Sequence, residues 1–288
     1  MTIWTDLLGH EISQKYYDVN GVRTRVIEAG RGEPLIFLHG TGGHAEAYTR
    51  NIVAHAARFR VLAVDMVGHG FSDAPEVGYD IGTYASHLGD LIDVLGADRV
   101  CLSGESLGAM VATWYAIRNP SRVRKLVLNT GMLMERDAAG RAQLRDAMER
   151  SKRASGQLTR DAVHARLAWL MADPEKSVTE ELVETRYRIY TQPGRAAVLG
   201  RISAHVFGGL LDDAWTEQWS NSERMRELRC PTLVIWSRHN PGLTPERARL
   251  GKDKIPDARM IVLEKSAHWP QWEEPDAFNR FHLDFLAS

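Results

Sequence analysis

The sequence predicts an α/β protein, with a mostly parallel sheet flanked by helices and an inserted helical cap. Three observations predict this class. Short continuous apolar runs recur along the 288 residues, segments with helical spacing lie between them, and one long stretch past the middle has no convincing strand. Continuous apolar runs are typical of strands buried on both faces, and their alternation with helices favours parallel pairing through right-handed crossovers.

The first element expected is an antiparallel hairpin over 15–28, because Asn20-Gly21 is a strong turn signal between two extended segments. Helices are expected over 81–95 and 107–119. The apolar runs have the length of buried parallel strands. They lie at 35–38, 61–64, 100–103, 125–128, 232–236 and 260–263.

The alternation of expected strands and helices stops from about residue 135 to about residue 215, where Arg, Ala, Glu and Leu dominate. Thr179 precedes two acidic residues, which is a good start for a helix. Helices are expected at 141–155, 160–169, 179–190 and 196–207. A helical block between two strands usually forms a cap above the strand ends. We therefore expect an α/β core over 1–134 and 215–288, with a helical cap over 135–214.

The composition excludes several classes of protein. With 36 Lys+Arg and 37 Asp+Glu the formal net charge is −1, which argues against an electrostatic nucleic-acid binder. No run approaches the roughly 18 apolar residues of a membrane span, and no secretion signal begins the sequence. Cys101 and Cys230 each start an apolar run, which favours two buried, reduced thiols over a disulfide or a metal pair. We expect a cytoplasmic protein without metal, cofactor, nucleic-acid or membrane partner.

The most specific motif is Gly104-Glu105-Ser106-Leu107-Gly108, between an expected strand and an expected helix. This is the context that a G-x-S-x-G nucleophile elbow requires. The sharp turn needs flanking residues without bulk and projects the serine hydroxyl from the sheet. The motif predicts Ser106 as a nucleophile.

A serine hydroxyl needs a base to remove its proton. His268 follows the last expected strand, where such a base belongs, and we predict it as the general acid and base. His39 and His69 stand in glycine-rich loops and are better explained as structural braces.

Acyl chemistry also needs hydrogen-bond donors for an oxyanion. Leu107 N–H, directly after the nucleophile, is one expected donor, and Thr41 N–H in the loop after the first parallel strand is the other. Gly40 and Gly42 flank Thr41 and let the backbone approach a substrate. The alternative is that this loop is a tight turn only.

Together, the Ser106 elbow, the His39-Gly40 loop, the stretch 65–73 and the late His268 resemble the α/β-hydrolase fold over nearly the whole chain. Within that fold the chain looks most like the meta-cleavage-product hydrolases. These cofactor-free enzymes cut a carbon–carbon bond in 2-hydroxy-6-oxo-hexa-2,4-dienoates during aromatic degradation. The narrower resemblance rests on the His-Trp-Pro-Gln-Trp-Glu run at 268–273, Phe-Asn-Arg at 278–280 and Thr-Glu-Glu-Leu at 179–182.

The resemblance implies that Arg186 binds the substrate carboxylate and dienol oxygen, which suits the fork of a guanidinium. Without the resemblance, we would interpret Arg186 as a surface arginine on an amphipathic helix. Trp269 either lines the pocket or packs as a core aromatic. Relatives imply a homo-oligomer, dimeric or larger. Residues expected to line an apolar pocket for the acyl group, or to form the cap core, are Met132, Met134, Trp169, Met171, Phe207, Trp215 and Trp219.

The pattern breaks at the acid of the triad, where Asn240 stands 28 residues before His268. Asn accepts a hydrogen bond from Nδ1–H but brings no negative charge, and the corresponding change in a serine protease costs about 10⁴ in kcat. We favour Asn240 as the group that orients His268. The alternatives are another carboxylate, such as Glu135, or a reaction step that tolerates a weaker base.

Glu105 is a second departure, since some relatives carry Asn before the nucleophile. Its carboxylate either alters the polarity of the pocket or points back into the fold and pairs there.

These residues give a leading hypothesis of a cofactor-independent serine hydrolase that cleaves a carbon–carbon bond in a small dienoate. The runner-up is a carboxylesterase or lactonase acting on small esters, which gain nothing from Arg186. A third hypothesis is a non-catalytic ligand-binding protein, supported only by the missing acid at position 240.

Overall fold

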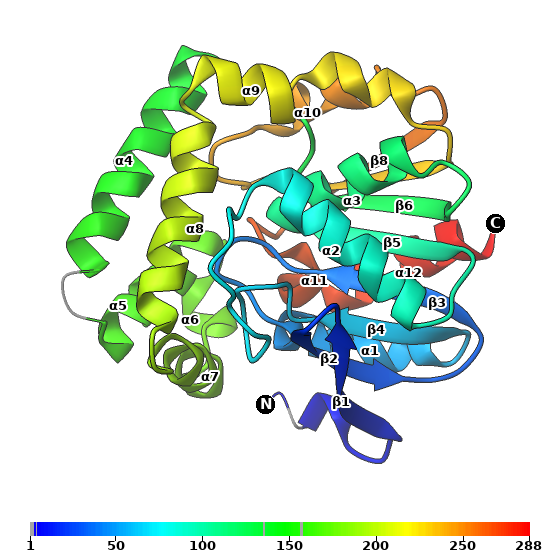
Figure 1. The fold of residues 1–288 in the computed structure, drawn as a ribbon. Coiled ribbons are helices and arrows are strands. Elements are labelled where there is room, and N and C mark those ends of the chain that lie inside the picture. The colour runs from blue at the N-terminus through cyan, green and yellow to red at the C-terminus, as the bar shows by residue number, and fades with distance from the viewer. Residues whose placement is uncertain (1–2, 4, 135, 156–157) are drawn as a thin grey trace.

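The computed structural model describes residues 3, 5–134, 136–155 and 158–288, and Figure 1 gives their arrangement. At its centre is an eight-stranded sheet in the order β1-β2-β4-β3-β5-β6-β7-β8. The pairs β1–β2 and β2–β4 are antiparallel, and every other neighbouring pair is parallel. The predicted α/β class is confirmed. The strands are β1 Ile12–Val19, β2 Val22–Ala29, β3 Glu33–Leu38, β4 Phe59–Val64, β5 Val100–Glu105, β6 Val123–Asn129, β7 Thr232–Ser237 and β8 Ala258–Leu263.

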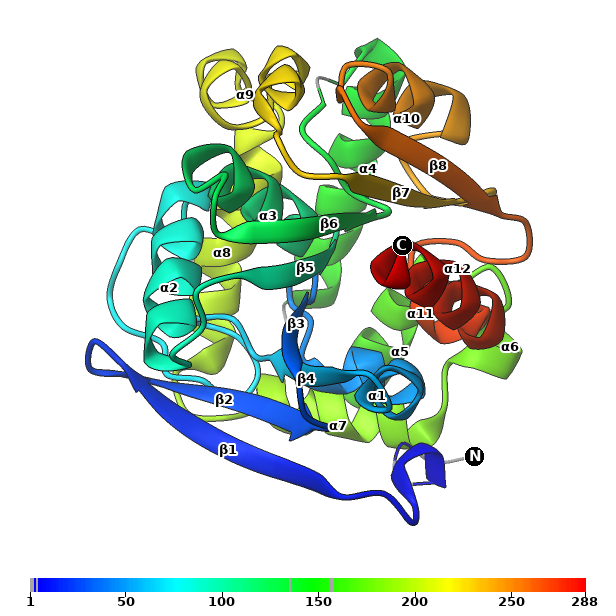
Figure 2. The same ribbon diagram turned by 90° about the vertical axis from the view of Figure 1, so that its right-hand side faces the viewer.

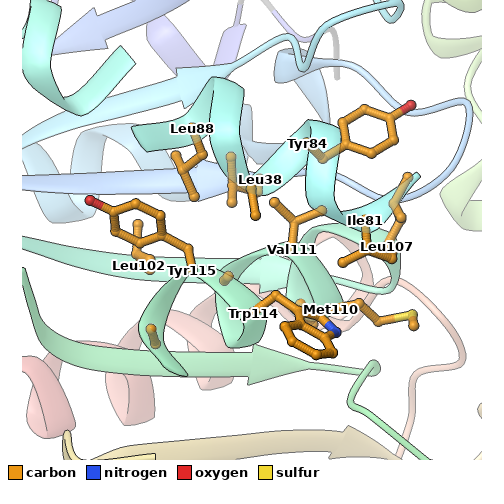
Figure 3. Packing of buried hydrophobic residues seen from close by; sticks show 14 of the residues in the cluster. Leu38, Ile81, Tyr84, Leu88, Leu102, Leu107, Met110, Val111, Trp114 and Tyr115 are labelled. Atoms are coloured by element: carbon orange, nitrogen blue, oxygen red, sulfur yellow. The ribbon is translucent and has the colours of Figure 1, made fainter. Parts of the chain in front are cut away.

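Both faces of the sheet are covered, which explains why the strands read as unbroken apolar runs. Successive strand residues point to opposite faces. Ile36 and Leu38 pack in one core cluster with α2 (Ile81–Val94) and α3 (Leu107–Arg118), of which Figure 3 gives a close view. Leu35 and Phe37 pack in the other, with α1 (Thr49–Ala56) and α12 (Pro275–Ala287), and Figure 2 shows these helices on opposite sides of the sheet. Cys101 and Cys230 are buried and free, as predicted.

The segment between β6 and β7 is helical, and its long helices stand together at one end of the sheet (Figure 1). The four helices expected here are present. Thr179 caps α7, because its side chain accepts a hydrogen bond from Leu182 N–H. Two short helices, α6 and α9, were not predicted. The helices are α4 Ala138–Ser155, α5 Arg160–Leu170, α6 Pro174–Ser177, α7 Glu180–Tyr190, α8 Arg195–Gly209 and α9 Asp213–Trp219.

The remaining elements are short. They are η1 Thr5–Leu7, η2 Ala45–Tyr48, η3 Ser222–Glu227, α10 Pro245–Lys252 and α11 Pro270–Glu273. Among all the helices in the described ranges, none is long and apolar enough to cross a membrane.

Helix α3 starts directly at the end of β5 because two glycines let the backbone pack closely. A Cβ on Gly104 would lie 2.2 Å from the carbonyl oxygen of Gly108, and a Cβ on Gly108 would lie 2.3 Å from the carbonyl oxygen of Leu38. Real Cβ atoms do not approach so closely. The small residues of the motif therefore hold α3 against both β5 and β3.

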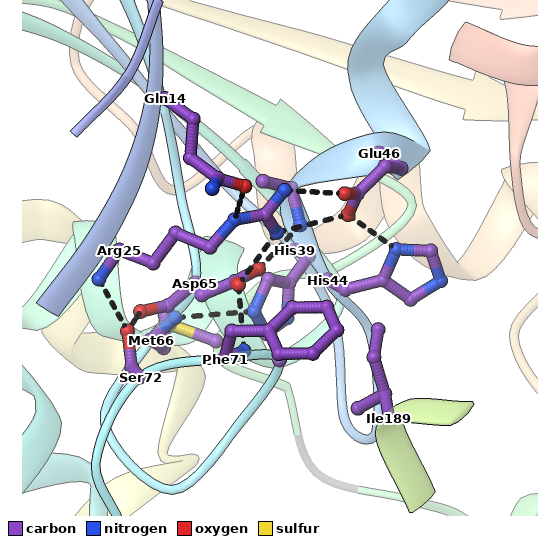
Figure 4. Close-up of polar contacts among 12 residues, drawn as sticks. Gln14, Arg25, His39, His44, Glu46, Asp65, Met66, Phe71, Ser72 and Ile189 are labelled. Atoms are coloured by element: carbon purple, nitrogen blue, oxygen red, sulfur yellow. Dashed lines mark hydrogen bonds and ion pairs between the residues drawn. The ribbon is translucent and has the colours of Figure 1, made fainter. Parts of the chain in front are cut away.

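A buried polar network fixes the loops that follow β3 and β4 (Figure 4). Asp65 accepts hydrogen bonds from the backbone N–H groups of Ala45 and Phe71, at 2.7 and 2.8 Å, and from Arg25 at 2.9 Å. His39 accepts from Met66 N–H at Nε2 and donates from Nδ1 to Gly40 O. His39 is thus a brace for this loop, as predicted, and burial lowers its pKa to about 3.

A chain of buried histidines ties α1 and α12 to the centre of β5. His55 Nδ1–H donates to Asn51 O, His55 Nε2 accepts from His282 Nδ1–H at 2.9 Å, and His282 Nε2 accepts from Ser103 Oγ at 2.9 Å. The two links in which Nε2 accepts need neutral rings. Burial accordingly lowers the pKa of His55 to about 4 and that of His282 well below its usual value.

The glycine contacts give the first testable prediction. Gly108→Ala forces a methyl group against the backbone of β3 and is expected to lower the free energy of unfolding by about 3 kcal/mol. Gly200→Ala is the matched control, because nothing lies within 4 Å of a Cβ at this helical position. There the change is expected to stabilise by about 0.5 to 1 kcal/mol. Urea unfolding of both variants measures the difference, and equal effects would contradict the packing argument.

The buried histidines give a second prediction, on pH. His39, His55 and His69 stay neutral in the fold, with pKa values of about 3, 4 and 3, against 6.5 for a free histidine. As the pH falls below 6.5, the unfolded chain binds protons at these histidines and the native state does not, so the free energy of unfolding falls. Each such histidine removes about 1.4 kcal/mol per pH unit down to its folded pKa. Urea midpoints between about pH 7 and pH 5 test this slope, and replacing the exposed His10 by Gln is expected to leave it unchanged.

Candidate active site

Ser106 occupies a strained turn between β5 and α3. Its backbone has φ 52° and ψ −112°, a left-handed conformation that costs a non-glycine residue about 1 to 3 kcal/mol. A hydrogen bond to β6 fixes the turn, since Ser106 N–H donates to Asn129 O at 3.1 Å. Leu107 is the first residue of α3, so its N–H has no acceptor within the helix. The geometry is that of the elbow which the sequence motif predicted.

His268 lies in the loop between β8 and α11 and is fixed by its backbone. Its N–H donates to Leu170 O, and its carbonyl oxygen accepts from Thr130 Oγ1, both at 2.8 Å. The ring nitrogen Nδ1 lies 2.6 Å from Asn240 Oδ1. The amide of Asn240 is itself oriented, because Nδ2 donates to Leu243 O at 3.0 Å. This arrangement fits the orienting role expected of Asn240. Glu135, the alternative carboxylate, lies outside the described residues.

Glu105 faces the other side of the same imidazole. Its Oε1 lies 3.0 Å from His268 Nε2, and the side chain is 1% exposed. Neither carboxylate oxygen accepts a hydrogen bond of regular geometry from any described residue. Gly40 makes room for the group, since a Cβ there would lie 2.5 and 2.9 Å from the two oxygens. The carboxylate therefore lies in the site rather than pairing back into the fold.

Ser106, His268 and Glu105 border a cavity of about 290 Å³ that also reaches helices α4, α5 and α8. Its full lining is Gly40, Thr41, Gly43, Glu105, Ser106, Arg136, Gln143, Leu144, Asp146, Arg166, Trp169, Leu170, Phe207, Pro241, Gly242, His268 and Trp269.

Of the predicted site residues, Ser106, His268, Thr41, Gly40 and Trp269 meet at this cavity. The others are not among its lining residues but adjoin them. Leu107, Asn240 and Gly42 are sequence neighbours of lining residues, and the guanidinium of Arg186 lies 5.0 Å from the ring centre of Trp269. The carbonyl oxygen of Gly42 accepts a hydrogen bond from Tyr190 at 2.8 Å.

Arg186 is buried in α7, with 1% exposure, so it is not a surface arginine. Its guanidinium lies 5.0 Å from the ring centre of Trp269 and 6.0 Å from that of Tyr190. Nε and Nη2 are buried and have no hydrogen-bond partner among the described residues. A buried cation without a partner is costly. This is the state expected of a group that binds an anion beside Trp269.

Arg166 was missed by the sequence reasoning. It projects from α5 into the cavity, where its guanidinium lies 4.8 Å from the ring centre of Trp169 and 5.7 Å from that of Phe207. Burial lowers its pKa from the usual 12.5. The available signal was its spacing, since Arg166 stands three residues before Trp169 and therefore shares its helix face.

The pocket is less apolar than expected. Of the seven apolar residues proposed for it, only Trp169 and Phe207 line the cavity. Met132 packs near Gly251 of α10, and Trp219 packs edge-on against Trp114, and neither lines the cavity. No group of three or more His, Cys, Asp or Glu side chains in the described part of the chain is placed to hold a metal ion.

Comparison with known proteins gives a consistent set of relatives. The family model described as alpha/beta hydrolase fold matches residues 33–275. The chain is 30% identical to the 2-hydroxy-6-oxononadienedioate/2-hydroxy-6-oxononatrienedioate hydrolase of Comamonas testosteroni, over 98% of this chain and 99% of the relative. The same three figures hold for the 2-hydroxy-6-oxo-6-phenylhexa-2,4-dienoate hydrolase of Burkholderia cepacia. The solved meta-cleavage product hydrolase of Pseudomonas fluorescens IP01 superimposes with a TM-score of 0.79, at 26% identity and with 96% and 98% of the two chains covered.

The contact between His268 and Asn240 gives a third prediction. Asn240→Ala removes the acceptor that orients the ring, a loss of about 1 to 3 kcal/mol. At about 1.4 kcal/mol per factor of ten, the hydrolytic kcat is expected to fall about 10- to 100-fold, with a smaller effect on KM. His239→Ala is the control, because that side chain is exposed beside the same loop and is expected to leave kcat unchanged. Equal kcat values for the two variants would remove Asn240 from the mechanism.

Proposed function

The chain belongs to the meta-cleavage-product hydrolases of the α/β-hydrolase fold family, and we propose that it hydrolyses a carbon–carbon bond in a 2-hydroxy-6-oxo-hexa-2,4-dienoate. The proposal makes it a serine-dependent, cofactor-independent enzyme with a small-molecule substrate. The relatives named above carry this activity in their names.

The observation that carries the proposal is the unpartnered guanidinium of Arg186. A dienoate brings a carboxylate and a neighbouring enol oxygen, which together match the two parallel donors of an arginine fork. Trp269 contacts this cation, with its ring centre 5.0 Å from the guanidinium, and directly follows His268 in the sequence. A substrate anchored at Arg186 would therefore extend past His268 toward Ser106.

The proposed reaction begins with a change of tautomer. The dienol loses its 2-hydroxyl proton to water, and the dienolate receives a proton at C5 from His268, which leaves a ketone at C2. That carbonyl, conjugated through C3 and C4, accepts the electron pair when the C5–C6 bond breaks. Ser106 Oγ attacks the C6 carbonyl as His268 takes its proton.

The oxyanion formed at C6 needs fixed donors. Thr41 N–H and Leu107 N–H are proposed for this role, on opposite sides of Ser106. Collapse of this intermediate breaks the C5–C6 bond, and His268 passes the proton taken from Ser106 to the departing dienolate oxygen, which releases a hydroxypentadienoate. Water, deprotonated by the neutral His268, then attacks the acyl-serine ester. The proton returns to Ser106 Oγ and the acid is freed.

The segment 135–214 is proposed as a cap that closes over this site. Its helices contribute Arg166, Trp169 and Phe207 to the cavity around the acyl group, and Arg186 to the opposite end of the substrate. The mixed lining accommodates an acyl group that combines apolar surface with a polar substituent.

A carboxylesterase or lactonase acting on small esters is the second candidate, because the elbow and His268 serve either reaction. The two are separated by following the loss of the yellow dienoate chromophore beside the release of p-nitrophenol from p-nitrophenyl esters. Turnover of esters alone would favour the second candidate.

A fourth prediction concerns Arg186 directly. Arg186→Met is expected to lower kcat/KM for the dienoate about 100-fold, because charge-assisted hydrogen bonds to the carboxylate are lost. Turnover of p-nitrophenyl esters is expected to change little. Since the variant also removes an unpaired buried charge, its unfolding free energy is expected to stay equal or rise by about 1 kcal/mol.

The matched control is Arg188→Met, an exposed arginine on the same helix that pairs with Glu184 at 2.6 Å. It is expected to leave both activities unchanged. Loss of ester turnover in Arg186→Met with dienoate turnover intact, or marked destabilisation of that variant, would contradict the assigned role.

A further inference from the structure

We propose that Glu105 and His268 hold one proton between them at Nε2, and that Glu105 supplies the negative charge which Asn240 does not. Glu105 is thereby a positioning residue that keeps His268 protonated at the start of the reaction.

The contacts of Asn240 fix the tautomer of His268. Asn240 cannot turn its amide over, because Nδ2 donates to Leu243 O at 3.0 Å and a flip would set two oxygens against each other. Oδ1 must therefore face the imidazole, and Nδ1, 2.6 Å away, must carry a hydrogen. In a neutral ring the other nitrogen, Nε2, then has only a lone pair.

Nε2 lies 3.0 Å from Glu105 Oε1, within ion-pair distance although no hydrogen bond of regular geometry joins the two atoms. A neutral ring would leave the buried carboxylate without a charge partner. A proton on Nε2 supplies that partner, because it sets an imidazolium beside a carboxylate and makes the pair neutral as a whole.

No hydrogen-bond donor among the described residues satisfies Glu105. The side chain is 1% exposed, and its oxygens lack hydrogen bonds from the residues that the structure describes. Two groups interact with its charge besides His268. Arg166 interacts with it electrostatically across the cavity, and Tyr48 lies beneath it, with a pKa raised by burial and by Glu105. A shared proton removes most of the cost of a buried charge.

The shared proton also predicts the order of the reaction steps, and this consequence rests on the proposed function. A dienolate bound at Arg186 accepts the shared proton at C5, and the pair is left with one negative charge. His268 is then a free base, and the proton of Ser106 restores the pair as Oγ attacks C6. An ester offers no carbon that takes the first proton, so it meets a histidine that is still protonated.

The test is Glu105→Gln, which keeps the shape and removes the charge. The ¹⁵N resonance of His268 Nε2 at neutral pH is expected to move from the protonated to the unprotonated range. Dienoate kcat is expected to fall at least about 10-fold, as when a general acid is impaired. Labelling of Ser106 by a fluorophosphonate is expected to become about 10-fold faster, because the ring is now a free base.

Two variants control the experiment. Glu105→Asp keeps the charge and is expected to keep Nε2 protonated and labelling slow. Glu46→Gln removes another largely buried carboxylate, 2.9 Å from His44 and outside the cavity lining, and is expected to leave the His268 resonance and the labelling rate unchanged. Circular dichroism verifies that each variant is folded.

The outcomes separate the two proposals. An unchanged Nε2 resonance, or unchanged labelling, in folded Glu105→Gln overturns the shared proton. A shifted resonance and faster labelling in a protein that cleaves no dienoate support the shared proton and overturn the proposed function. Because a structural role for Glu105 would depress all activities together, opposite changes in labelling and dienoate cleavage carry the inference.

Discussion

The close contact of α3 with the ends of β5 and β3 is the constraint on which the site depends. With glycine at 104 and 108, carbonyl oxygens of the neighbouring backbone occupy the positions where Cβ atoms would lie. The chain must then leave β5 through one sharp turn, and Ser106 absorbs the strain of it. The same turn brings the side chain of Glu105 against the loop at Gly40. The proposed nucleophile, the proposed oxyanion donor and their acidic neighbour are thus consequences of one backbone approach.

The charges around the cavity belong to side chains that are largely buried near the ends of the strands. Glu105 contributes an anion at the floor, while Arg166 and Arg186 contribute cations from helices that lie over the strand ends. Within the described residues neither arginine has an ion-pair partner, whereas surface arginines such as Arg188 pair with neighbouring carboxylates. Positive charge left unpaired near a cavity is a property of a site that receives an anion, and it fits the acidic substrate proposed for a chain whose total charge is balanced.

The sequence was informative where one physical effect dominates. Continuous apolar runs predicted the strands, because each strand is covered on both faces, and the G-x-S-x-G spacing predicted the turn at Ser106. It was less informative where tertiary contacts decide. α9 is a helix of seven residues whose signal is weak in isolation, and Met132 belongs to the packing of α10 although it follows β6 closely in sequence. The direction of Glu105 depends on the missing Cβ of Gly40, a residue far away in the chain.

The amide at position 240 is adapted to its surroundings rather than a damaged acid. Leu243 O lies 3.0 Å from Nδ2, so a carboxylate there would set an oxygen against a carbonyl oxygen. The loop that follows β7 thus favours a group that accepts on one side and donates on the other. An amide does both, but it cannot offset an imidazolium, and the nearest buried carboxylate stands across the ring at Nε2. Negative charge on that side holds the proton where it faces the substrate, which suits a reaction that protonates carbon before the serine attacks.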